Sequence, residues 1–228
     1  MAKEKKGCKI TILKDGPYIV SGGVPLSEKI ISPIGNTYEY KEGRSLPQAE
    51  TYALCRCGHT KTPPFCDGRH EECKFDGTET ASNSNFMDRI DLRIQGPELD
   101  LLDDGRCAFA RFCHREDGDL WTLTESSNPE HVEDVIKGAR ECPAGRLEVK
   151  DKEGRTIEEE FEAAIEVLQD PERGVSGPLY VKGNIEIQSS KGDTYEKRNR
   201  VTLCRCGESR NKPFCDAMHV PRAYSDKK

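Results

Sequence analysis

A repeated spacing of cysteine and histidine constrains this chain more than any other feature. Two groups, each with three cysteines followed by one histidine, have the same spacings of two, nine and four positions. The groups are Cys55, Cys57, Cys66 and His70, and Cys204, Cys206, Cys215 and His219. Three thiolates and one imidazole make a complete set of four metal ligands. Unliganded cysteines have no reason to keep such a spacing, so the sequence predicts two metal centres.

The composition favours several small units over one large core. Only 34% of the 228 residues are hydrophobic, 33% are charged, and the mean hydropathy is -0.76. So little apolar material cannot fill the core of a large barrel or a doubly wound enzyme. Bound metal would supply stability that small cores lack.

The cysteine count and the charge indicate where such a chain works. Eleven cysteines, an odd number, occur without an apolar export signal near the start. This favours a reducing compartment, where clustered thiolates usually bind metal. No run approaches the roughly 18 apolar residues of a spanning helix, and the net charge of -6 provides no basic surface. We therefore expect a cytoplasmic protein that binds neither nucleic acid nor membrane.

The sequence that precedes each ligand group is also repeated. Asp15–Leu26 is echoed by Ser176–Ile187, and the first copy carries an insertion at Lys41–Gln48 that we expect to be a surface loop. Each copy contains two short β-type runs closed by glycine, which predict short antiparallel strands. These runs are Tyr18–Val20, Val24–Leu26, Leu179–Val181 and Ile185–Ile187.

A different segment lies between the copies, after a polar stretch at Gly77–Asn85 that is typical of a linker. Asp91–Ile94 and Leu99–Leu102 are expected to be strands. Asn128–Arg140 predicts a helix with Asn128 as its N-cap and proline in its first turn. Ile165–Val167 fits a helix or a strand, and we favour a strand that enters the second copy.

The pattern C-x-C-x2-[S/T]-x3-P-x-C-D-G-x-H resembles the CDGSH iron-sulfur family, and both copies match it almost throughout. The resemblance implies that each group holds a 2Fe-2S cluster, the first two cysteines on one iron and the third cysteine with the histidine on the other. The second copy departs at Ala217, where the motif has glycine, and at Met218; the first departs at Arg69. A structural zinc site with the same ligands is the alternative.

The single imidazole in each set has a physical consequence. Replacing one thiolate by neutral histidine makes a cluster less negative, which raises its reduction potential. A ligand histidine can also be protonated, so cluster retention is expected to depend on pH.

Three further cysteines, Cys107, Cys113 and Cys142, form a second kind of signal. Cys142 precedes a proline, as in the cluster run of bacterial ferredoxins, and Ala110 stands where such a run has its middle cysteine. The segment resembles the divergent single-cluster ferredoxins, and the lost cysteine resembles those that hold a 3Fe-4S cluster on three thiolates. A 4Fe-4S cluster with His114 as fourth ligand, or inert thiols in a ferredoxin-like remnant, are the alternatives.

Together these resemblances imply an α+β chain of three units, with two small β-rich CDGSH domains flanking a ferredoxin-like α+β domain. The expected boundaries are 1–80, 86–155 and 160–228. CDGSH proteins commonly pair two cluster units, so the two copies are expected to form a pseudo-dimer within one monomeric chain.

The expected function is electron transfer with an unknown redox partner. Cluster storage and delivery to an acceptor protein is the first alternative, and a structural zinc-binding interaction module is the second. The sequence specifies no nucleophile, base or substrate pocket, so no enzymatic activity is expected.

Overall fold

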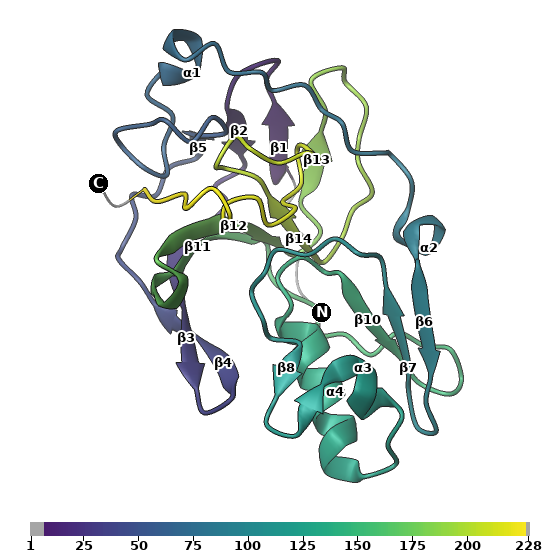
Figure 1. Ribbon diagram of the computed structural model, residues 1–228. Helices are drawn as coiled ribbons and strands as arrows, with labels where there is room; N and C mark the ends of the chain where they lie inside the picture. Colours follow the sequence, from purple (N-terminus) through teal and green to yellow (C-terminus); the bar gives the residue numbers. More distant parts are fainter. Residues whose placement is uncertain (1–6, 227–228) are drawn as a thin grey trace.

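The computed structural model describes residues 7–226, which form a mixed α+β structure built mainly from small sheets (Figure 1). The two repeats flank a central segment, as the sequence predicted. Within the described residues, none of the helices has the length and apolar character needed to cross a membrane.

Two sheets contain the strands of both repeats. The first sheet has the order β13-β1-β2-β5, and the second has the order β14-β12-β11-β3-β4. The first comprises β1 (Lys9–Ile12), β2 (Tyr18–Ser21), β5 (Thr51–Leu54) and β13 (Glu186–Gln188). The second comprises β3 (Leu26–Ile34), β4 (Thr37–Glu42), β11 (Ala164–Asp170), β12 (Val175–Lys182) and β14 (Arg200–Leu203).

The two repeats exchange one strand each. β13 of the second repeat pairs in parallel with β1 of the first, with Ile187 opposite Ile10. β3 of the first repeat pairs in parallel with β11 of the second, with Leu26 opposite Ile165. The sequence analysis expected antiparallel strands at Val24–Leu26 and Ile185–Ile187. That expectation is wrong for the pairing with the other repeat, which is parallel. Residue alternation sets which face of a strand is buried but does not name the neighbouring strand.

The exchange gives the repeats one shared core, which explains how a chain of low hydropathy makes a stable unit. Apolar side chains from both sheets pack into a single cluster. Its most buried members are Ile10, Val20, Leu54, Ile165, Val167, Val181 and Leu203. The domain boundaries at residues 80 and 160 remain predictions; each exchanged strand lies within its own unit and pairs with a strand of the other.

The central segment lies at the lower right of Figure 1, with β6, β7 and β10 at the right and α3 and α4 at the bottom. A three-stranded sheet of order β10-β7-β6 packs with the short helix α3 and the longer helix α4. The elements are α2 (Phe86–Arg89), β6 (Leu92–Gln95), β7 (Asp100–Asp103), β8 (His114–Arg115), β9 (Gly118–Asp119), α3 (Leu120–Thr124), α4 (Pro129–Glu141) and β10 (Leu147–Lys150).

Several local predictions are confirmed in this layer and beside it. Asn128 caps α4 by accepting a hydrogen bond from the Glu130 amide at 3.1 Å. The two expected strands correspond to β6 and β7, and the ambiguous run is β11. A one-turn helix, α1 (Arg69–Glu72), and a 3-10 turn at Pro171–Arg173 complete the described elements.

Candidate metal centres

The first ligand group lies in the loops that follow β5, and its members approach each other in two pairs. The sulfurs of Cys55 and Cys57 are 3.6 Å apart. The sulfur of Cys66 lies 3.3 Å from Nδ1 of His70. Phe65 forms a β-bridge to Leu54, which fixes the second pair against the first.

The second ligand group repeats this arrangement after β14. The Cys204 and Cys206 sulfurs are 3.6 Å apart, and the Cys215 sulfur lies 3.6 Å from Nδ1 of His219. Phe214 forms the equivalent bridge, to Leu203. In residues 7–226, no three Cys, His, Asp or Glu side chains surround a single point where one metal ion could bind.

These distances fit ligands that share a tetrahedral metal in pairs. Two thiolates held about 2.3 Å from one tetrahedral ion lie roughly 3.7 Å from each other, and a thiolate and an imidazole nitrogen lie about 3.6 Å apart. All four pairs fall within a few tenths of an ångström of these values. The donor sets therefore suit two metal atoms in each group.

The neighbouring cysteine and nearby main-chain amides favour the thiolate form of the first cysteine in each group. The pKa of Cys55 is lowered, chiefly by a hydrogen bond with the Cys57 thiol and further by the amides of Gly58 and Thr60. The pKa of Cys204 is lowered in the same way. The shared hydrogen bond and burial raise the pKa of the second cysteine in each pair, Cys57 or Cys206, so a bound metal would have to displace its proton.

The aspartate of each motif ties the two ligand pairs together. Asp67 accepts hydrogen bonds from the amides of Lys61 and Arg69, at 2.8 and 3.2 Å. Asp216 accepts from the amides of Arg210 and Met218, at 2.8 and 3.3 Å. In both copies the carboxylate therefore links the loop after the first cysteines to the turn that carries the histidine.

Ala217 has the same backbone conformation as the glycine it replaces. Its φ is 68°, and that of Gly68 is 89°, both in the left-handed region. The Ala217 amide still reaches the Cys215 sulfur at 3.4 Å. The turn keeps its geometry, at the steric cost that a Cβ has in this region.

Comparison with known proteins identifies the repeated units. Residues 15–71 and 176–220 match the family described as the iron-binding zinc finger of CDGSH type. The chain contains two CDGSH units. Each matched segment includes one complete ligand group. The family match does not extend to residues 72–175. No curated protein and no solved structure matched the chain.

The arginine between the first two cysteines is a structural feature of both CDGSH units that the sequence analysis missed. Arg56 is 2% exposed and donates to the carbonyls of Leu13, Gly16 and Gly77. Arg205 donates to the carbonyls of Gly177 and Leu168 and pairs with Asp226. The presence of the same C-R-C triplet in both copies was the available signal.

The two CDGSH units differ in how far solvent reaches their ligands. Cys66 and His70 are partly exposed, whereas Cys215 and His219 are only 4% and 3% exposed. Burial, with a further contribution from Arg205, lowers the pKa of His219 to about 4. The second ligand group is therefore enclosed, while in the first group Cys55 and Cys57 are buried and only Cys66 and His70 reach the surface.

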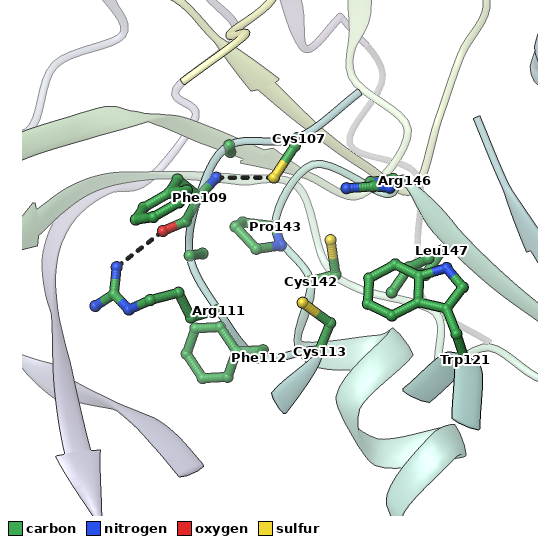
Figure 2. A pocket seen from close by; sticks show the side chains of 12 residues that line it. Cys107, Phe109, Arg111, Phe112, Cys113, Trp121, Cys142, Pro143, Arg146 and Leu147 are labelled. Carbon is green, nitrogen blue, oxygen red and sulfur yellow. Dashed lines mark hydrogen bonds between the residues drawn. The ribbon is translucent and has the colours of Figure 1, made fainter. Parts of the chain in front are cut away.

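The three central cysteines lie around one small hollow. Figure 2 shows the sulfurs of Cys107, Cys113 and Cys142 at the edge of this space, with Pro143 and Trp121 beside them. The loop between the first two cysteines curls around the hollow, and the Phe109 amide donates to the Cys107 sulfur at 3.3 Å. Phe109 and Arg111 have φ values of 58° and 68°. Such conformations in non-glycine residues persist where surrounding structure enforces them, often at functional sites.

The chemistry of this thiol set fits a positively charged group. Burial and the nearby sulfurs of Cys142 and Cys107 raise the pKa of Cys113 to about 12. Burial also raises the pKa of Cys142, and Cys107 contributes. Three thiolates so close together repel each other unless a cation compensates them. A bound cation such as iron would favour the thiolate forms, and the three cysteines are the residues that would hold it.

Neighbouring residues support the hollow, but His114 does not belong to it. Arg146 binds Asp103 through two hydrogen bonds of 2.6 and 2.7 Å, and its pKa is raised by Asp103 and by the nearby Cys107. Trp121 donates to the same carboxylate at 3.0 Å. His114 is exposed on β8 and does not line the hollow, so the structure does not bring it to the three cysteines.

The three candidate centres adjoin one another. Cys57 and Cys206 form a β-bridge between the two CDGSH units. On its other side the second unit packs Cys215 against Ala108 and Ala144, in a cluster that includes Cys142. The second CDGSH unit thus lies between the first unit and the central hollow.

Proposed function

We propose that this chain is a multi-cluster protein that transfers single electrons between a protein donor and a protein acceptor. Cys55, Cys57, Cys66 and His70 would hold one 2Fe-2S cluster, and Cys204, Cys206, Cys215 and His219 a second. Cys107, Cys113 and Cys142 would hold a 3Fe-4S cluster. When bound, these clusters supply one-electron redox chemistry, while the chain supplies position and environment.

The observation that supports electron transfer most directly is the contiguity of the three centres. Ligand backbone touches ligand backbone at Cys57 and Cys206, and Cys215 packs on the segment that carries Cys142. A carrier benefits from such an arrangement because each redox group lies next to another. A protein that only stored clusters would have no need of contacts between its sites.

The chain's own residues hold this arrangement rigid. Arg200 of β14 donates to the carbonyls of Ala139 and Cys142, and these hydrogen bonds attach the C-terminal end of α4 to the second CDGSH unit. Arg111 pairs with Asp170 at 2.6 Å and with Glu172 at 3.1 Å, which fastens the central loop to β11. Ordered surroundings keep the ligands in place during a change of charge and exclude water from the second centre.

Cluster delivery to an acceptor protein is the second candidate function, and one observation favours it. His70 and Cys66 are partly exposed, so an acceptor could approach the first centre directly. Protonation of a ligand histidine would weaken its hold on a cluster, which would make retention pH-sensitive at an accessible site. The partner in either function is unidentified, and the complete pair of units suits a cytoplasmic monomer.

Spectroscopy of anaerobically purified protein tests the proposal. Two 2Fe-2S clusters and one 3Fe-4S cluster predict about seven irons and about eight sulfides per chain. We expect a coloured protein whose optical and EPR spectra change with dithionite. Colourless protein that retains zinc after anaerobic iron reconstitution would overturn the proposal and leave a structural zinc module.

Redox cycling separates the two candidate functions. Repeated reduction and reoxidation at neutral pH, followed by desalting and an iron assay, measures whether clusters stay in place. Electron transfer predicts that the iron content is unchanged after several cycles. Transfer of about two irons per chain to an apo-ferredoxin added during the cycles would instead favour delivery.

A further inference from the structure

One positively charged side chain, that of Arg146, is directed toward the three central cysteines. Arg146 lies in the loop between α4 and β10, four positions after Cys142, and lines the same hollow. Figure 2 shows its guanidinium beside the Cys107 sulfur, on the side toward Trp121. Arg111 is the other charged residue of the lining, but its guanidinium points away from the three sulfurs in Figure 2.

An ion pair with Asp103 fixes the orientation of this guanidinium. Nε and Nη2 of Arg146 donate to the two oxygens of Asp103, at 2.6 and 2.7 Å. The Asp103 side chain is only 2% exposed and also accepts a hydrogen bond from the Trp121 indole at 3.0 Å. The guanidinium carbon lies 5.3 Å from the centre of the Trp121 ring. A bidentate pair and an aromatic ring therefore hold the charge in one place.

The pairing with Asp103 leaves the third guanidinium nitrogen, Nη1, available. Within residues 7–226, Nη1 donates to no oxygen or nitrogen acceptor. The planar fork places it away from a carboxylate that binds Nε and Nη2. The Cys107 sulfur is close enough to help Asp103 raise the pKa of Arg146 against the opposing effect of burial. Nη1 is therefore the donor that remains for a ligand sulfur.

Arg146 also acts on the other two thiols. Burial raises the pKa of Cys142, and the main-chain amide of Arg146 opposes that increase. Burial likewise raises the pKa of Cys113, and the charge of Arg146 opposes the increase there. A single residue thus interacts favourably with negative charge on all three central sulfurs.

We propose that Arg146 is a positioning residue that raises the reduction potential of the cluster held by Cys107, Cys113 and Cys142. This role rests on the proposed function, because it requires that cluster. A fixed positive charge beside the ligands stabilises the more negative, reduced state, and hydrogen bonds to ligand sulfur act in the same direction.

The negative charge of Asp103 offsets only part of this effect. Asp103 does not line the hollow, whereas Arg146 does, so the guanidinium lies between the carboxylate and the sulfurs. The nearer charge dominates, because the interaction between charges falls with distance.

Redox titration of the anaerobically purified full chain, followed by EPR, tests this role. An oxidised three-iron cluster has an odd number of ferric ions and is paramagnetic, whereas an oxidised 2Fe-2S cluster is not, so one sample reports both kinds separately. Arg146→Gln is expected to lower the midpoint of the central cluster by about 59 mV or more, equivalent to a tenfold change in the ratio of oxidised to reduced cluster. The midpoints of the two CDGSH clusters are the internal reference and are expected to stay unchanged, because none of their ligands lines the hollow.

Matched variants separate the charge of Arg146 from its structural contacts. Arg146→Lys keeps the charge and is expected to restore most of the midpoint. Arg146→Gln leaves the Asp103 carboxylate buried with one partner fewer, so the double variant Arg146→Gln/Asp103→Asn removes both charges and is expected to lower the midpoint in the same direction. Arg93→Gln removes a charge from an exposed position on β6 and is expected to leave the midpoint unchanged. Circular dichroism and iron analysis check that each variant is folded and loaded.

The same titration distinguishes failure of this role from failure of the proposed function. An intact EPR signal with an unchanged midpoint in both Arg146→Gln and the double variant would refute the role of Arg146 and leave the proposed function standing. Absence of the oxidised-state signal from the unmodified chain, with fewer than about seven irons, would remove the central cluster and refute both.

Discussion

Arg56 and Arg205 show how one residue between two ligand cysteines can organise a whole unit. Arg56 uses its guanidinium on three main-chain carbonyls, which belong to the loop before β2 and to the segment after α1. The guanidinium carbon of Arg56 lies 5.1 Å from the centre of the Tyr18 ring. Since Arg56 lies between Cys55 and Cys57, its hydrogen bonds hold both the surrounding loops and the two ligand cysteines in position.

We predict that Arg56→Gln destabilises the protein by about 2 to 4 kcal/mol, because it leaves buried carbonyl oxygens without donors. Urea unfolding followed by far-ultraviolet circular dichroism measures this change in unfolding free energy. Arg93→Gln, at an exposed strand position, is the control and is expected to change stability by less than about 0.5 kcal/mol. A loss for Arg56→Gln no greater than that of the control would contradict the role assigned to Arg56.

At the scale of elements, the sequence predicted local structure well and the pairing of strands poorly. The ends of α4 and the positions of β6, β7, β2 and β12 follow from caps and from short β-type runs. Parallel pairing of β3 with β11 brings together residues more than a hundred positions apart, which no local pattern encodes. The ligand residues were recognisable because their spacing is local, whereas the contacts between centres depend on the exchanged strands.

Ala217, in the turn that carries His219, allows a prediction about the stability of the folded chain. Ala217→Gly removes the cost of a Cβ at φ 68° and is expected to stabilise the chain by about 1 kcal/mol, or about 2 to 4 °C in the thermal midpoint. Thermal unfolding by circular dichroism measures the shift. Ala53→Gly, within strand β5, should instead lose about 0.5 to 1 kcal/mol because glycine loses more conformational freedom there. If both variants lose stability, the left-handed turn at residue 217 is not a source of strain.

At the scale of the whole molecule, the two CDGSH units meet through glycines beside their ligands. A Cβ built on Gly58 would lie 2.5 Å from the Cys206 carbonyl oxygen, and one on Gly207 would lie 2.6 Å from the Cys57 oxygen. These are main-chain atoms, so no side-chain rotation relieves the clash. A side chain at the position after the second cysteine of either unit would therefore clash with the main chain of the other unit.

Gly58→Ala is therefore predicted to force the units apart and to cost about 3 kcal/mol or more in unfolding free energy. Gly68→Ala is the matched control, because Gly68 also has a positive φ but nothing lies within 4 Å of an added Cβ. The control is expected to lose only about 1 kcal/mol, the cost of the backbone conformation alone. Urea titration of both variants measures the difference, and equal losses would mean that the close approach contributes nothing.

The unequal exposure of the two CDGSH centres predicts that they release iron at different rates. Chelation by an excess of bathophenanthroline disulfonate, followed by absorbance, is expected to show one fast phase before any slower ones, because solvent reaches Cys66 and His70 more readily than Cys215 and His219. We expect the first centre to release its iron at least about tenfold faster, a difference of roughly 1.4 kcal/mol in activation free energy. Cys66→Ser should remove the fast phase, and Cys215→Ser should remove a slow one. If Cys66→Ser left the fast phase intact, the exposed centre would not be the labile one, and delivery from the first unit would lose its physical basis.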